Sequence, residues 1–263
     1  MSSVWGFALS FITISLIFYY FYLTRTKSIE ETKKWKKASF ISGAILFFIA
    51  HSTFVSELGT SLFFVHMLQQ TVTYFMVPPL ILLGLTDSLL KPLYNQRILS
   101  FILTFFTNPV VALSLFNILF SLYYLPMIFD TIMASSLNQA LAMIILLPLS
   151  FVMWWPLVSP AKNDSTLKPL TKIIYIVGMG AFMTPLATLI IFSNKVLYRT
   201  YESLPRVYDI AILNDQQAGG VAMKVIQMII YCIMIAYAFS EAVKMDRSQT
   251  EEANKPISPD KSF

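Results

Sequence analysis

Residues 66–85 read HMLQQTVTYFMVPPLILLGL, which is the length of a helix that crosses a bilayer. Its first two helical turns carry four polar side chains, which are His66, Gln69, Gln70 and Thr73. The spacing i, i+3, i+4 and i+7 places them on one face of the helix. Because lipid cannot satisfy such a face, we expect it to point into a bundle of helices.

Two adjacent prolines, Pro78 and Pro79, interrupt the same helix. Proline has no N–H group, so the carbonyl oxygens of Tyr74 and Phe75 lose their usual helical partners. Neighbouring helices or water must then satisfy these oxygens. The double proline therefore predicts a kink that tilts the half of the helix with His66 relative to the other half.

The composition agrees with a membrane protein. The chain has 263 residues, of which 56% are hydrophobic and only 13% are charged, whereas soluble domains carry about 25% charged residues. The net charge of +5 is spread among short loops and does not indicate nucleic-acid binding. The single cysteine, Cys232, allows no internal disulfide, and the CxxC pairs of a strong copper or zinc site are absent from the sequence.

Hydrophobic patterning predicts an all-α, polytopic membrane protein. The expected spans form a seven-transmembrane-helix bundle within residues 1–243, at 4–23, 38–55, 61–85, 108–127, 137–158, 171–193 and 217–240. A stretch at 97–107 is expected to form an interfacial helix before the fourth span, with Asn108-Pro109 as the boundary. The polar residues 244–263 predict a disordered tail.

The basic residues predict the orientation. Fifteen of the nineteen Lys and Arg residues fall in the loops and tail on one side, and four fall on the other. Cytoplasmic loops carry the excess of Lys and Arg, so the N-terminus is expected outside and the C-terminal tail in the cytoplasm. Both histidines of the chain, His51 and His66, then lie towards the outer side.

The last span opens with NDQQAGG at residues 214–220. Asn214 or Asp215 is interpreted as an N-cap, with Gln217 placed as in a capping box. The two glycines are interpreted as a close contact with another helix.

Two further features have structural interpretations. Trp154-Trp155 is interpreted as part of an interfacial aromatic belt. Lys224 lies about two turns into the last span, where an isolated Lys costs roughly 2.5–3.5 kcal/mol. It is expected either to extend to the outer surface or to pair with an acidic residue, the candidates being Glu57, Asp130 and Asp215.

Taken in order, five segments of the chain resemble the CtaG family of cytochrome c oxidase assembly factors, in particular its Bacillus-type members. The segments are LGTSLFFVHMLQQ with VPPLILLG (58–84), NPVVALSLFNILFSLYYLPMIFD (108–130), MWWPLVSP (153–160), LIIFSNKVLYRTY (189–201) and NDQQAGGVAMKVIQ (214–227). They extend from the second span to the seventh, which is most of the chain.

The resemblance implies a seven-helix, multi-pass protein of the bacterial plasma membrane that assists maturation of a haem-copper terminal oxidase and has no catalytic turnover. Oxidase subunits would be its partners in the lipid bilayer, and copper insertion at the outer face is the step suggested for the family. By motif, the implied metal ligands are His66, Met67 and Met223. The other implied binding residues are Gln70, Asp215, Gln216 and Gln217.

The sequence departs from the family pattern at several positions. Many relatives have a second histidine where this chain has Gln70, Trp-His where it has Tyr123-Tyr124, and histidine near Asn138 and Ala142. Cu(I) accepts imidazole and thioether ligands, so His66 with Met67 or Met223 would hold it weakly. The alternative, which the missing histidines favour, is a structural hydrogen bond between His66 and Asp215 across two helices.

Two other classes of function remain open. One is a small-molecule or ion transporter that uses the outward polar cluster, although the sequence has no internal repeat of the kind many transporters show. The other is an intramembrane enzyme or cofactor-binding redox protein. It lacks paired mid-membrane histidines for haem and any H-E-x-x-H motif.

Overall fold

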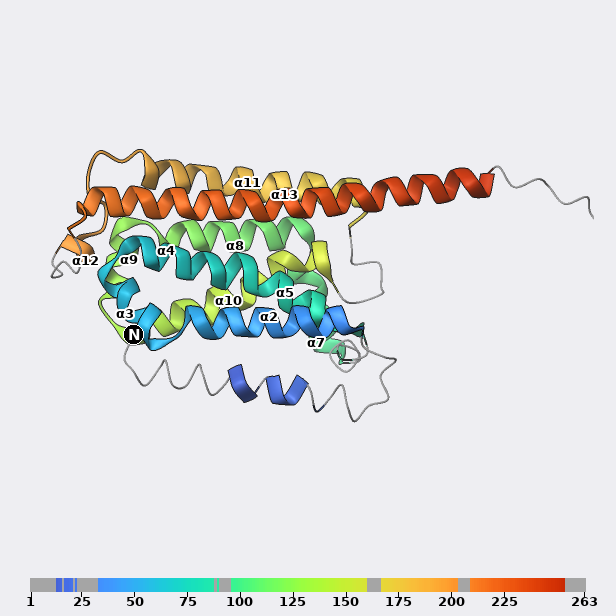
Figure 1. Cartoon of the computed structure of the whole chain (residues 1–263), viewed down its shortest axis with the longest axis horizontal. Coiled ribbons are helices and arrows are strands. Elements are labelled where there is room, and N and C mark those ends of the chain that lie inside the picture. Colours follow the sequence, from blue (N-terminus) through green and yellow to red (C-terminus); the bar gives the residue numbers. More distant parts are fainter. Residues whose placement is uncertain are drawn as a thin grey trace, which may run out of the picture.

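A computed structural model describes residues 13–15, 17–20, 22, 33–87, 89, 96–159, 167–202 and 209–253 of the chain. Every element within these residues is a helix, and the long helices run side by side along the long axis of the molecule (Figure 1). The predicted all-α class is therefore confirmed for the part of the chain that the structure describes.

Most helices begin and end near the predicted positions. In chain order they are α2 (Lys34–Ala50), α3 (Thr53–Ser61), α4 (Phe63–Thr71), the π-helix η1 (Val72–Met76), α5 (Val77–Gly84), α7 (Arg97–Phe106), α8 (Pro109–Tyr123), α9 (Pro126–Met133), α10 (Ser136–Val158), α11 (Pro169–Ile191), α12 (Arg199–Glu202) and α13 (Ile212–Ala253).

Three helices, α10, α11 and the apolar part of α13, are long and apolar enough to cross a membrane. Two bent pairs, α2 with α3 and α7 with α8, meet the same criterion together, which gives up to five spans in the described residues. The third predicted span is divided among α4, η1 and α5, and most of the first lies outside the described residues. The count of seven and the orientation stay predictions.

The double proline is accommodated by a change of helix type. The five residues of η1 form a π-helical turn immediately before α5, which has Pro78 and Pro79 in its first turn. A π-helix bonds each N–H to a carbonyl five residues back, so the ladder is rearranged where the prolines lack donors. The chain is helical without interruption from Phe63 to Gly84.

Trp154 satisfies one of the two oxygens that the prolines leave without a helical partner. Its indole N–H donates to the carbonyl oxygen of Tyr74 at 3.1 Å. The Trp154 side chain has 0% of its surface exposed, and Trp155 beside it has 9%. The interpretation of this pair as an interfacial belt is therefore wrong. The physical reason is that a freed backbone oxygen inside the bundle needs a donor, and α10 supplies one.

Two bends place the other elements. The axes of α2 and α3 differ by 52°, with His51 and Ser52 at the break. The axes of α7 and α8 differ by 71°, and the Asn108 side chain caps α8 by accepting the Val110 N–H at 3.1 Å. The predicted boundary at Asn108-Pro109 is thus confirmed.

Close packing of α13 confirms the interpretation of its two glycines. A Cβ on Gly219 would lie 2.9 Å from the Phe63 ring of α4. A Cβ on Gly220 would lie 2.9 Å from side-chain atoms of Ile190 and Ile191 of α11. Neither position has room for a larger side chain, so α13 packs against both helices.

The predicted boundary of the tail at residue 243 does not coincide with a helix end. The α13 helix continues to Ala253, and residues 254–263 lie outside the described part. The sequence from Ser240 to Ala253 contains neither glycine nor proline. Nothing in it interrupts a helix that has already formed.

Candidate functional site

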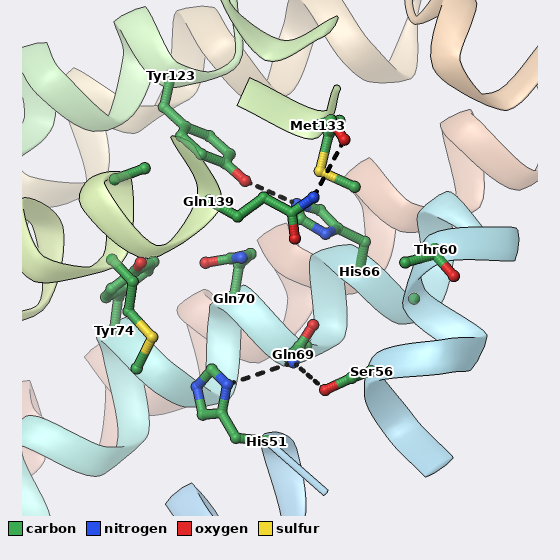
Figure 2. A pocket seen from close by; sticks show the side chains of 13 residues that line it. His51, Ser56, Thr60, His66, Gln69, Gln70, Tyr74, Tyr123, Met133 and Gln139 are labelled. Atoms are coloured by element: carbon green, nitrogen blue, oxygen red, sulfur yellow. Dashed lines mark hydrogen bonds between the residues drawn. The ribbon is translucent and has the colours of Figure 1, made fainter. Parts of the chain in front are cut away.

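Both histidines of the chain line one cavity inside the bundle. The polar face of α4 forms one wall, and Figure 2 shows Gln70 between His51 and His66. The cavity has a volume of about 40 Å³ for water centres, which is enough for a few water molecules. The lining residues are His51, Ser56, Gly59, Thr60, His66, Gln69, Gln70, Tyr74, Tyr123, Met133, Gln139, Ala142 and Met143.

The expectation that the polar face of α4 points into the bundle is met. Three of its four residues line the cavity, and His66, Gln69 and Thr73 are all buried. Thr73, in η1, is not part of the lining and contacts His51. The polar groups therefore surround a shared interior space, where neither lipid nor the apolar core has to accommodate them.

The tautomer of His51 follows from its partners. The Thr73 hydroxyl donates its only proton to the carbonyl oxygen of Gln69 at 2.7 Å. Its oxygen lies 3.1 Å from His51 Nε2, so it must accept a proton from that nitrogen. In the neutral ring, Nδ1 then keeps a lone pair, and its nearest polar partner is the Gln69 amide nitrogen at 3.5 Å.

Gln69 fixes this corner of the cavity from the other side. Its amide nitrogen donates to the Ala50 carbonyl oxygen at 2.8 Å, at the end of α2. The same nitrogen lies 3.5 Å from the Ser56 hydroxyl of α3. The bend between α2 and α3 is thereby tied to α4, which holds His51 against the cavity.

His66 is held in an aromatic surrounding. Its Nε2 lies 3.3 Å from the Tyr123 hydroxyl at the end of α8. Its ring centroid lies 5.3 Å from that of Phe129, almost perpendicular to it. When Nε2 carries the proton and donates to Tyr123, Nδ1 keeps a lone pair, as in His51.

Two thioethers complete the lining, and the sequence analysis did not select them. Met133 ends α9, and Met143 lies in the third turn of α10. The carbonyl oxygen of Met133 accepts from the Gln139 amide at 3.1 Å, which joins the two helices at this wall. Thirteen methionines in an apolar chain gave no signal for these two, because methionine also serves as core filler.

The predicted ligands Met67 and Met223 lie elsewhere. They are 0% and 1% exposed, respectively, and belong to the apolar core. Met67 packs where a Cβ on Gly219 would meet its Cγ at 3.1 Å. The structure therefore places neither thioether on the wall of the cavity that holds His66.

Asp215 caps a different helix from the one it belongs to. It lies in the first turn of α13, and its carboxylate accepts the backbone N–H groups of Phe63 and Phe64 at 2.8 and 3.1 Å. These are donors that the first turn of α4 leaves free. The hydrogen bond expected between Asp215 and His66 is not formed, since the N-terminus of α4 binds the carboxylate and Tyr123 binds the imidazole.

The neighbouring glutamines hold the loop before α12. Gln216 accepts the Leu197 N–H at 2.7 Å, and Gln217 donates to the Ser193 carbonyl oxygen at 3.0 Å. The interpretation of Gln217 as part of a capping box is therefore wrong, because its side chain contacts the loop after α11 instead. Asp215, Gln216 and Gln217 together tie the start of α13 to α4 and to this loop.

The donor set is unsuited to a tight site for a hard divalent ion. Among the described residues, no group of three or more His, Cys, Asp or Glu side chains is placed to hold a metal ion. The cavity instead offers two imidazoles, two thioethers and neutral amides. Soft thioethers and imidazole suit Cu(I) better than Mg²⁺ or Ca²⁺.

The sequence profile of the cytochrome c oxidase caa3 assembly factor family (Caa3_CtaG) matches residues 17–245. The chain belongs to this family. The resemblance found in the sequence is therefore confirmed over most of its length. No curated protein and no solved structure matches the chain.

Several positions at which the resemblance implies other residues lie at the cavity. Gln70, Tyr123 and Ala142, at or near which the resemblance implies other residues, all lie on its wall. Tyr124 lies directly behind it, with its ring centroid 4.9 Å from that of Tyr123. These positions thus lie on or beside one interior space, which His51 and His66 also line.

Proposed function

We propose that this chain assists the assembly of a haem-copper cytochrome c oxidase in the bacterial plasma membrane, as a helper that performs no catalytic turnover. We further propose that its cavity takes up Cu(I) and passes it on at the outer side of the membrane. Membership of the caa3 assembly factor family supports the first statement. The second rests on one observation, the meeting of both histidines with two thioethers in a single cavity.

Each histidine is arranged as a metal-binding histidine usually is. Such a residue donates its second ring N–H to a neighbouring acceptor, which fixes the ring and the tautomer. His51 donates from Nε2 to Thr73 and keeps the Nδ1 lone pair. The Tyr123 hydroxyl can play the same part for His66. These contacts would leave one nitrogen of each ring for Cu(I).

The same contacts support passage of the ion rather than storage. The His51 Nδ1 lone pair already lies 3.5 Å from the Gln69 amide, so the ion would displace a weak neutral contact. Among the described residues, no carboxylate or thiolate lines the cavity to hold the ion tightly. An assembly factor must release what it carries, and neutral ligands permit that release.

The size of the cavity bears on the transporter alternative. About 40 Å³ of space for water centres admits an ion with a few waters, and it excludes most organic solutes. A role in carrying an ion is therefore better supported than uptake of a small organic molecule.

Deletion of the gene tests the proposed function. We expect the deletion strain to lose most of its cytochrome c oxidase activity, and added copper to restore part of it. The measurement is oxidase activity per membrane protein together with reduced-minus-oxidised haem spectra. A strain expressing the chain from a plasmid is the control. Unchanged oxidase activity in the deletion strain contradicts the proposal, above all if an ion-uptake activity disappears instead.

A further inference from the structure

Lys224 is a positive charge placed deep along α13. It lies nine residues after Asp215, which corresponds to about 13 Å along the helix axis. Asp215 itself lies in the first turn of the helix, at the end of the bundle that is predicted to face outside. Lys224 therefore belongs to the apolar part of the span.

The Lys224 side chain does not extend towards the predicted outer surface. Its ammonium group donates to the Thr184 hydroxyl at 3.0 Å and to the Gly180 carbonyl oxygen at 3.4 Å. Gly180 is level with Tyr231, because a Cβ on Gly180 would lie 3.7 Å from that ring. Tyr231 lies seven residues further along α13. The charge is thus directed further into the span, opposite to the direction of snorkelling.

Among the described residues, no carboxylate forms an ion pair with Lys224. Its expected partners were Glu57, Asp130 and Asp215. Glu57 is exposed on α3, and the other two have other contacts, as does Glu241, which was not among the expected partners. Asp215 caps α4, Asp130 binds the backbone N–H and hydroxyl of Thr200, and Glu241 pairs with Lys172 at 2.8 Å. Both predicted outcomes for Lys224, extension to the surface and pairing with an acidic residue, are therefore wrong.

The surface around this charge is shaped for another helix. Figure 1 shows α11 and α13 along one side of the bundle. Thr184 is exposed, and the residues above and below it on the same face of α11, Ala181 and Thr188, are exposed and small. Val221 and Met228 flank Lys224 on α13 and are about half exposed. Small residues let helix backbones approach closely in a membrane.

A charge inside the bilayer that lacks a countercharge usually marks a functional contact. A second copy of this chain cannot supply the countercharge, because none of the seven predicted spans contains Asp or Glu. Lipid phosphates lie at the membrane surface and not at this depth. A carboxylate on a membrane helix of a different protein is therefore the partner that matches this ammonium in charge and depth.

We propose that Lys224 is the docking point for a transmembrane helix of a partner protein that carries an Asp or Glu at the same depth. The partner carboxylate pairs with the ammonium, and the partner helix packs along Ala181, Thr184 and Thr188. Resting on the proposed function, we assign this helix to a membrane subunit of the oxidase under assembly. The contact would hold the client beside the chain inside the bilayer.

Site-specific photo-crosslinking in cells tests this docking. The photoreactive residue p-benzoylphenylalanine is placed at Val221 or at Met228, and the crosslinked protein is identified by mass spectrometry. The same labels are combined with Lys224→Met, which removes the charge, and with Lys195→Met as a matched control on an exposed lysine. Protein level and thermal unfolding in detergent show whether each variant folds.

We expect the label to capture a membrane subunit of the oxidase at a helix with an intramembrane Asp or Glu. Lys224→Met should lower the yield at least tenfold, and Lys195→Met should leave it unchanged. If Lys224→Met unfolds the chain, Lys224→Glu combined with a Lys in place of the captured carboxylate should restore the crosslink. An unchanged yield in folded Lys224→Met overturns the proposal, as does a captured helix without a carboxylate or a double variant without a crosslink.

The two proposals can fail separately. If the deletion strain keeps its oxidase while the label still captures an acidic helix of another protein in a Lys224-dependent manner, the docking site stands and the oxidase role does not. If the deletion strain loses its oxidase while Lys224→Met changes neither crosslinking nor oxidase activity, the docking site is overturned and the oxidase role stands.

Discussion

The indole N–H of Trp154 lies 3.1 Å from the carbonyl oxygen of Tyr74, to which it donates a hydrogen bond. That oxygen belongs to the π-helical turn before Pro78 and Pro79, and proline at position 78 cannot supply its usual partner. One aromatic side chain on α10 thus supplies the donor that Pro78 cannot supply to this oxygen. The contact ties the π-helical turn η1, which lies between α4 and α5, to α10.

Trp154→Phe should destabilise the protein without emptying the core. The ring remains, the donor is lost, and the Tyr74 oxygen is left buried without a partner. We expect a cost of about 0.6–2 kcal/mol, the range for interhelical hydrogen bonds in membranes. Thermal unfolding in detergent measures it, with the exposed Trp35→Phe as the control. An equal midpoint for the two variants would show that the hydrogen bond contributes nothing.

Asp215→Ala should destabilise the chain through α4. Two backbone N–H groups, those of Phe63 and Phe64, lose a charged acceptor, and hydrogen bonds to charged groups contribute about 1.5–3 kcal/mol. Asp215→Asn keeps one acceptor oxygen and should cost less. The steady-state amount of protein in membranes and its unfolding temperature measure both, and Asp209→Ala, at an exposed carboxylate, is the control. A stable Asp215→Ala variant would disprove the capping role.

Substitutions of residues that line the cavity should lower the supply of copper to the oxidase, whereas substitutions of methionines away from the cavity should not. We expect His66→Gln or His51→Gln to lower oxidase activity several-fold, with partial rescue by added copper. The double variant Met133→Leu with Met143→Leu should act in the same direction. Met67→Leu keeps the packing of a residue away from the cavity and should be near normal. Loss of activity in Met67→Leu with normal activity in the double variant would favour the ligand set expected from the sequence.

Cysteine labelling in intact cells should confirm the predicted orientation. In a chain with Cys232→Ser, single cysteines are introduced one at a time and treated with a membrane-impermeant maleimide. Those at Glu57, Asp130 and Tyr208 should react in sealed cells. Those at Lys34, Lys91 and Asp164 should react only after permeabilisation. Rapid labelling at Lys34 in sealed cells would reverse the orientation.

The positions of several helices could be predicted from the sequence because the signals for them are local. Apolar runs set α10 and α11 to within about two residues, and the Asn108-Pro109 pair marked the start of α8 correctly. The polar face of α4 and the two glycines of α13 were also interpreted correctly, since each depends on helical spacing or on a missing side chain.

What the sequence missed were pairings between distant helices. Asp215 is of a residue type that often caps its own helix. Only the packing of α13 against α4 shows that it instead accepts the N–H groups of Phe63 and Phe64. The position of Trp154 near the end of the fifth predicted span suggested the membrane interface. Its hydrogen-bond partner, the carbonyl oxygen of Tyr74, lies 80 residues earlier in the chain. The placement of His51 and His66 on one cavity likewise depends on the bend after α2, and no local pattern predicted that bend.

The copper content of the finished oxidase tests the central claim most directly. The oxidase is isolated from cells that lack this chain and from cells that express it, both grown with limiting copper, and its copper-to-haem ratio is measured. The proposed role predicts a ratio lowered several-fold without the chain, restored by the wild-type chain and not by His66→Gln. An oxidase with the same copper-to-haem ratio and the same yield in both strains would contradict it.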